Sequence, residues 1–167
     1  MSGPSFDQLL VRLLQADVRF VVIGGLALGS WGVIRGTKDC DIVPDPAPEN
    51  LDTLAGVAAA LGGHVQLGKS LLGSERSIAA LLRSGERALI ATRFGDLDVV
   101  QGLEGVLPYA ELRSSAIDVQ MADVTIPICA LEHLRTMKRA AGRPRDLVDL
   151  DDLDAAQPDH DTGAAPE

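Results

Sequence analysis

The chain of 167 residues has little aromatic or sulfur content: one Trp, one Tyr, three Phe and two Cys. Cys40 and Cys129 lack the spacing of a metal site or a disulfide framework, and each lies in an apolar, strand-like stretch. We therefore expect both to be small buried side chains of a protein in a reducing compartment, the cytoplasm.

Long apolar runs are also missing. No uninterrupted stretch approaches the roughly 20 apolar residues that a membrane-spanning helix needs. The first residues lack the basic segment and the apolar stretch of a signal peptide. These absences predict a protein without a membrane partner.

Positive charge is scarce, but the imbalance is concentrated at one end. The net charge is −9. Residues 151–167 hold six acids and no Lys or Arg, so residues 1–150 carry 18 acids against 15 bases, a net charge of −3. The low isoelectric point therefore argues only weakly against a polyanionic partner. We predict one domain over residues 1–153 and an acidic, disordered tail over residues 154–167.

Hydrophobic periodicity predicts alternating helices and strands. Helices are expected at 5–15, 26–34, 48–63, 129–143 and from 144 onward, and strands at 18–25, 38–45, 87–94, 95–103 and as a pair within 109–128. Residues 67–86 show no regular pattern and predict a mobile loop. In the last helix, Leu147, Leu150 and Leu153 are expected to point inward. This order predicts an α/β (α+β) fold, with a mixed sheet flanked by helices and a C-terminal helix pair.

Two aspartates, Asp39 and Asp41, share an apolar strand that follows a turn at Gly24 and Gly25. Residues two apart on a strand project from the same face, and neighbouring carboxylates repel unless a cation or a proton lies between them. A divalent metal would relieve the repulsion, and Mg²⁺ is the usual choice beside phosphates. The alternative is a pair of exposed acids on an edge strand. The glycines favour a metal site over this alternative. A backbone without Cβ atoms at the start of a helix lets a phosphate approach, and a phosphate there would share a metal ion with the two aspartates.

A second acidic pair, Asp96 and Asp98, also lies on a strand-like segment at a spacing of two. Asp98 is the preferred third carboxylate, because Val99 and Val100 place it deeper in the sheet, and Asp96 is the alternative. A glycine turn with three strand carboxylates favours metal-assisted phosphoryl transfer.

The segment "GGLALGSWGVIRGTKDCDIV" resembles the signature of the DNA polymerase β-type nucleotidyltransferase superfamily. Arg35, Thr37, Asp39 and Asp41 match its Arg-x-Thr-x-Asp-x-Asp form, with Cys40 where an aliphatic residue is usual.

Two later segments strengthen this resemblance. "TRFGDLDVVQGL" resembles the third-carboxylate strand of minimal members, and "LEHLRTMKRAAGRPRDLVDLDDL" resembles their C-terminal helices. In the latter, Lys138, Arg143 and Asp146 match a Lys…Gly-Arg-x-x-Asp pattern. The likeness spans residues 18–153 and is greatest to the AbiEii-type and MenT-like toxin nucleotidyltransferases.

The resemblance implies a role for each matching residue. Asp39 and Asp41 would hold Mg²⁺ (or Mn²⁺), and Asp98 would complete the metal site and act as the base toward the acceptor hydroxyl. The implied nucleotide-binding residues are Gly24, Gly25, Ser30, Arg35 and Lys138. Lys38 and Arg93 would add positive charge around the site, although for basic residues such as Lys138 and Arg143 a solvated helix end is the alternative.

The implied reaction moves a nucleotidyl group from a nucleoside triphosphate to a hydroxyl and releases pyrophosphate. The first acceptor implied is the 3′ end of tRNA, in a toxin with a cognate antitoxin or in phage defence. A protein tyrosine (AMPylation) and a small hydroxylated molecule are alternative acceptors. A relative that binds nucleotide or a partner protein without catalysis is a further alternative, which the three intact aspartates disfavour.

The segment "GHVQLGKS" at 63–70 matches the phosphate-loop pattern Gly-x₄-Gly-Lys-Ser. Such a loop needs a strand before it and a helix after it, whereas here a helix precedes Gly63 and a strand-like stretch lies inside the motif. We therefore interpret the match as a coincidence, although Lys69 and Ser70 could contact substrate from a loop beside the site.

Overall fold

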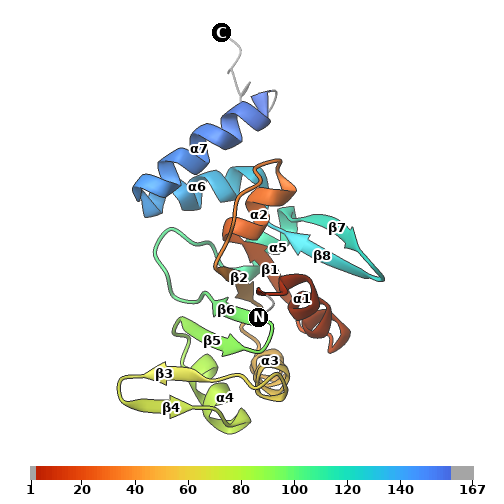
Figure 1. Cartoon of the computed structure of the whole chain (residues 1–167), viewed down its shortest axis with the longest axis vertical. Helices are drawn as coiled ribbons and strands as arrows, with labels where there is room; N and C mark the ends of the chain where they lie inside the picture. The colour runs from red at the N-terminus through yellow and green to blue at the C-terminus, as the bar shows by residue number, and fades with distance from the viewer. Residues whose placement is uncertain (1–2, 159–167) are drawn as a thin grey trace.

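The computed structural model describes residues 3–158, which form a six-stranded mixed sheet, a separate two-stranded sheet and flanking helices (Figure 1). The helices are α1 (Phe6–Gln15), α2 (Gly24–Ser30), α3 (Pro48–Ala60), α4 (Glu75–Arg83), α5 (Tyr109–Ser115), α6 (Leu131–Ala141) and α7 (Pro144–Ala156). The strands are β1 (Phe20–Ile23), β2 (Asp39–Pro44), β3 (Val65–Leu67), β4 (Ser70–Leu72), β5 (Ala88–Thr92), β6 (Gly95–Val99), β7 (Ile117–Met121) and β8 (Val124–Ile128). The predicted fold class and C-terminal helix pair are confirmed.

The large sheet has the strand order β5-β6-β2-β1-β8-β7. Its centre is apolar on both faces at β1, whose four residues are all buried, as expected for a β-branched run in a central strand. β2 runs antiparallel to β1 and parallel to β6. The parallel register sets Asp41 beside Asp98 and Cys40 beside Leu97, so the acids share one face and the apolar residues share the other.

The hydrophobic core lies on the face opposite the acids and continues under the helices. Cys40, Ile42, Leu97 and Val99 are fully buried there. Cys129 is buried as well, so the predicted burial of both cysteines is confirmed. α3 packs on α4 near one end of the molecule, and α6 packs on α7 at the other (Figure 1). None of the helices in the described residues has the length and apolar character that crossing a bilayer requires.

The prediction of a loop at 67–86 was wrong, because this segment forms the β3–β4 hairpin and α4. Gly68, at φ +59°, lies in the two-residue turn that joins Leu67 to Ser70, which is the backbone that such hairpins need. Ser74 caps α4 by accepting a hydrogen bond from the Ser77 amide at 3.1 Å. The strand pairing also removes the phosphate-loop alternative, since Lys69 occupies the exposed turn of a hairpin.

The C-terminal helices correct a second expectation. Gly142, at φ +59°, closes α6 as predicted. In α7, however, Leu147 is 54% exposed, whereas Asp146, Asp149 and Leu153 are buried. α7 continues to Ala156, beyond the predicted boundary at 153. The predicted disorder at 159–167 lies outside the described residues.

Candidate active site

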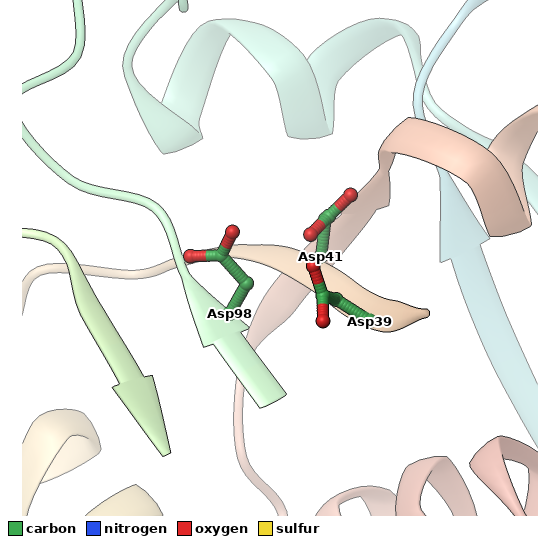
Figure 2. Close-up of side chains that lie close together, drawn as sticks. All are labelled: Asp39, Asp41 and Asp98. Atoms are coloured by element: carbon green, nitrogen blue, oxygen red, sulfur yellow. The ribbon is translucent and has the colours of Figure 1, made fainter. Parts of the chain in front are cut away.

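Three carboxylates converge above the middle of the large sheet. Asp39 and Asp41 extend from β2 and Asp98 extends from β6 into the same space (Figure 2). One oxygen of each carboxylate lies within 4.8 Å of an oxygen of the other two. Asp98 is 2% exposed, and the two β2 residues are partly buried. The structure thus brings together the three acids that the sequence analysis selected.

The register of β2 and β6 distinguishes Asp98 from its alternative. Asp96 pairs with Asp39 near the start of both strands, whereas Asp98 pairs with Asp41 one step further along. Asp96 does not belong to the close group of acids among the described residues. The deeper position expected for Asp98 therefore makes it the third member.

The crowding of these acids changes their protonation. Burial raises the pKa of Asp41 to about 7, with further contributions from the negative charges of Asp98 and Asp39. Burial and the charge of Asp98 raise the pKa of Asp39 as well. The site therefore favours a proton or a cation between its carboxylates. Three clustered carboxylate oxygens are also the donor set that a hard divalent cation prefers.

Arg87, immediately before β5, holds the third carboxylate. Its Nε donates to one oxygen of Asp98 at 2.9 Å and its Nη2 donates to the other at 2.5 Å. Arg87 was not among the residues selected from the sequence. The hairpin register could have indicated it, because Leu89 faces Asp98 across the β5–β6 pair and Arg87 lies two residues away on the same face.

The glycine turn is in direct contact with the carboxylates. Gly24 has φ +68°, and a Cβ at that position would lie 2.0 Å from Oδ2 of Asp41. A Cβ at Gly25 would lie 2.7 Å from Oγ1 of Thr37, which donates to the carbonyl of Asp39 at 3.0 Å. The absent Cβ atoms thus make room for this chain's own Asp41 and Thr37. The room for phosphates expected from the sequence stays a prediction.

We expect Gly24→Ala to destabilise the protein by about 1–3 kcal/mol, because the new methyl group meets Asp41 in a backbone conformation that disfavours L-residues. Chemical denaturation measures this loss. The matched control is Gly29→Ala in the same helix, where a Cβ meets nothing within 4 Å, and we expect a gain of about 0.5–1 kcal/mol there. Equal stability of Gly24→Ala and the parent would contradict the contact.

The carboxylates line one side of a cleft of about 360 Å³. Six basic residues also line it: Arg35, Lys38, Arg87, Lys138, Arg143 and Arg145. A further wall is apolar and is made by Leu103, Val106, Leu134 and Met137. The cleft therefore offers a place for cations beside one for anions, next to an apolar surface.

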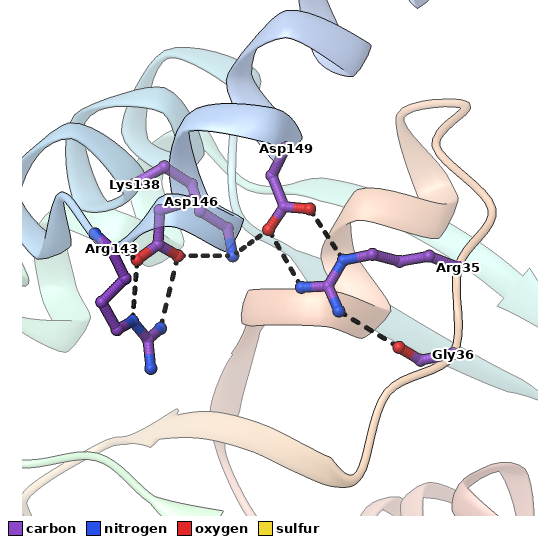
Figure 3. A network of polar contacts seen from close by, with 6 residues as sticks. All are labelled: Arg35, Gly36, Lys138, Arg143, Asp146 and Asp149. Carbon is purple, nitrogen blue, oxygen red and sulfur yellow. Dashed lines mark hydrogen bonds and ion pairs between the residues drawn. The ribbon is translucent and has the colours of Figure 1, made fainter.

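Along one wall of the cleft, a network of ion pairs fixes α6 and α7 to the loop before β2 (Figure 3). Nζ of Lys138 lies 2.9 Å from Asp149 and 3.3 Å from Asp146. Asp149 also accepts from Nη2 of Arg35 at 2.9 Å, and Asp146 accepts from Nε of Arg143 at 2.7 Å. Arg35 and Lys138, which the sequence resemblance assigns to nucleotide binding, line the cleft, but each is already paired with carboxylates of α7.

The acids of this network are held ionised. Burial by itself would raise the pKa of Asp149, but hydrogen bonds from Lys138 and Arg35 outweigh it and lower that pKa. Burial opposes ionisation of Asp146 in the same way, and its bonds to Arg143 and Lys138 lower its pKa. Asp149 was not selected from the sequence, and only its i, i+3 spacing from Asp146 could have indicated a shared buried face.

Some predicted residues do not reach the cleft. Ser30 lies at the far end of α2, roughly 10 Å from Gly24 along the helix, and is exposed beside a separate apolar pocket. Arg93 stacks over the ring of Phe94, 5.2 Å from its centroid, instead of lining the cleft. The expected phosphate contact from Ser30 is therefore not supported.

Comparisons with known proteins show the fold. A proposed nucleotidyltransferase from Thermotoga maritima aligns with 88% of this chain and 91% of its own length, with a TM-score of 0.55 and 16% sequence identity. The protein ANT(2″)-Ia, solved with adenylyl-2″-tobramycin, aligns with 89% of this chain and 97% of its own length, with a TM-score of 0.45 and 14% identity. No protein-family model and no curated protein matches the sequence. This chain therefore has the fold of the Thermotoga maritima protein.

Proposed function

We propose that this protein transfers a nucleotidyl group from a nucleoside triphosphate to a hydroxyl acceptor. The observation that carries the proposal is the convergence of Asp39, Asp41 and Asp98 in a cleft that also holds basic side chains. A metal–polyphosphate complex needs both kinds of group, since the acids bind the cation and the bases bind the phosphates. The fold shared with a proposed nucleotidyltransferase supports the same reaction class.

Asp39, Asp41 and Asp98 would hold Mg²⁺ or Mn²⁺. Their clustered oxygens fit such an ion, and the raised pKa of Asp41 reflects burial and like-charge crowding that a cation relieves. When bound, the ion would neutralise charge on the phosphates of the reacting nucleotide.

The basic lining of the cleft would bind the polyphosphate. Arg143 is accessible, because its side chain is 64% exposed even though it pairs with Asp146. Lys38 and Arg145 line the same cleft. Lys138 and Arg35 contribute positive charge from positions fixed by α7, and Gly24 and Gly25 line the cleft at the end of β1.

In the proposed reaction, the acceptor hydroxyl oxygen attacks the α-phosphorus of the nucleotide. The bond from that phosphorus to the pyrophosphate oxygen breaks, and pyrophosphate leaves with both bonding electrons. The hydroxyl proton passes to a carboxylate oxygen of Asp98, which lies at the inner end of the acidic cluster.

For the acceptor we propose the 3′ end of tRNA, which the resemblance to toxin nucleotidyltransferases suggests, together with a cognate antitoxin as partner. Exposed Arg139, Arg143 and Arg145 at the α6–α7 junction provide positive charge beside the cleft for a nucleic-acid backbone. A protein tyrosine and a small hydroxylated molecule are the alternative acceptors, and the same assay distinguishes all three.

The test incubates the protein with each nucleoside triphosphate labelled at the α-phosphate, Mg²⁺, and either total RNA, total protein or small-molecule extract. We expect label in one fraction, tRNA first, and a loss of about 10³-fold or more in Asp98→Asn. Asp96→Asn, which alters the neighbouring acid outside the close group, is the matched control and should retain activity. Absence of label from every fraction would instead favour a non-catalytic nucleotide-binding protein.

A further inference from the structure

Arg87 occupies both oxygens of Asp98 although it belongs to the wall of the cleft. The two nitrogen–oxygen distances, 2.9 and 2.5 Å, describe a bidentate pair. The two partners differ in exposure: the Arg87 side chain is 55% exposed and that of Asp98 is 3% exposed. The guanidinium can therefore turn toward solvent or a ligand, whereas the carboxylate is fixed.

This pair places a positive charge where the proposed cation would bind. A guanidinium on Asp98 opposes a second cation at the same carboxylate, because two positive charges a few ångströms apart repel in a partly buried site. It also lies beside Asp41 and Asp39, because a carboxylate oxygen of Asp98 is within 4.8 Å of an oxygen of each of them. Arg87 thus serves as a counter-ion for the acidic cluster.

A second partner for Arg87 would be the polyphosphate. Arginine binds phosphate and carboxylate with the same planar pair of donors, and Arg87 lines the cleft that also contains Lys38 and Arg143. A nucleotide in the cleft would offer Arg87 an anionic partner and leave Asp98 to the metal.

We propose that Arg87 is the resident counter-ion of Asp98, and that its exchange from Asp98 to the anionic substrate couples cation binding to nucleotide binding. This inference rests on the proposed function, since it requires a cation site at the three aspartates. It makes Arg87 a positioning residue that weakens cation binding in the free protein and strengthens binding of the polyphosphate.

The first measurement is Mn²⁺ binding to the free protein by electron paramagnetic resonance. We expect Arg87→Met to bind Mn²⁺ on the order of tenfold more tightly than the parent, because one positive charge is removed from the site. Arg87→Lys keeps the charge and should bind within about threefold of the parent. Arg83→Met is the matched control, because Arg83 also pairs with an aspartate, Asp52, but both residues are exposed and lie outside the cleft. The Mn²⁺ affinity of this variant should equal that of the parent.

The second measurement is binding of inorganic triphosphate with a chelator present and no metal. Arg87→Met should bind it at least about threefold more weakly than the parent, because one guanidinium–phosphate pair is lost. Thermal melting checks that each variant is folded. If Arg87→Met does not fold, Arg87→Gln replaces it, since Gln removes the charge and still offers Asp98 a hydrogen-bond donor.

The outcomes separate the two proposals. Equal Mn²⁺ affinity in the parent and Arg87→Met, with binding lost in both when Asp41→Asn is added, overturns the role of Arg87 and keeps the metal site. Absence of Mn²⁺ binding in every variant overturns the metal site and the proposed function. Tighter Mn²⁺ binding with unchanged triphosphate affinity overturns the exchange.

Discussion

Asp41→Asn is expected to lower the rate of nucleotidyl transfer by about 10³-fold or more, while the protein remains folded. Asp41 is central to the acidic cluster, since it pairs with Asp98 across the sheet and its oxygen lies against the Gly24 turn. An amide at this position keeps the shape of the side chain and removes a negative charge that a cation requires. The measurement is turnover of labelled triphosphate, with circular dichroism as the check on folding. Parent-like turnover would contradict our assignment of the site.

The same substitution is expected to stabilise the metal-free protein at neutral and alkaline pH. The pKa of Asp41 is raised from 3.8 to about 7. The protonated side chain therefore contributes fully to the stability of the folded state below about pH 4, and this contribution is lost as the pH rises through 7. Asparagine has no charge to desolvate. At pH 8 the free energy of unfolding of the variant should therefore exceed that of the parent by about 1–3 kcal/mol, after allowance for solvent screening. Urea denaturation with a chelator at pH 4 and pH 8 measures this difference in stability. The control is Asp123→Asn, in an exposed turn, whose stability should equal that of the parent at both pH values.

Lys138→Met is expected to cost about 3 kcal/mol of stability at pH 7, the largest loss that we predict for a single substitution here. The Lys138 side chain is 8% exposed and lies between Asp146 and Asp149, which are 0% and 2% exposed. Methionine fills the space of the alkyl chain but leaves two buried carboxylates with one fewer positive partner. Chemical denaturation of the two proteins measures the loss.

The pH dependence of this loss identifies its cause. The pKa values of Asp146 and Asp149 are lowered, so their pairing stabilises the protein above the ordinary aspartate pKa and is lost as the pH falls through the lowered values. The difference in free energy of unfolding between Lys138→Met and the parent should therefore become smaller below about pH 4. Arg139→Met, at the next and exposed position of α6, should change stability by less than about 0.5 kcal/mol. A gap that is small at pH 7 would contradict a structural role for the network.

The acidic cluster could be predicted from the sequence because it depends on local rules. A strand period of two sets Asp39 and Asp41 on one face, and glycine spacing marks the turn before them. The pairing of β2 with β6 is a non-local contact, so Asp98 was selected only from its own strand spacing and its apolar neighbours Val99 and Val100, and the resemblance to a known signature supported that choice. Arg87 was missed because its role depends on the register of a hairpin next to that pair.

The C-terminal network could not be predicted from hydrophobic periodicity. A leucine pattern in α7 suggested that Leu147 points inward, but the helix instead buries Asp146 and Asp149 and leaves Leu147 exposed. Burial of these acids becomes favourable only when Lys138, Arg35 and Arg143 arrive from other segments. The β3–β4 hairpin was not predicted, although the stretch that forms β3 is strand-like in the sequence. β3 and β4 are three-residue strands that bury little, so the pattern was too short to predict their pairing.

An anomalous-difference map from crystals grown with Mn²⁺ tests most directly whether three side chains from β2 and β6 share one ion. Our account predicts a peak between the carboxylates of Asp39, Asp41 and Asp98, and its disappearance in Asp41→Asn. A fully occupied Mn²⁺ elsewhere in the cleft, with the three aspartates unliganded, would contradict it.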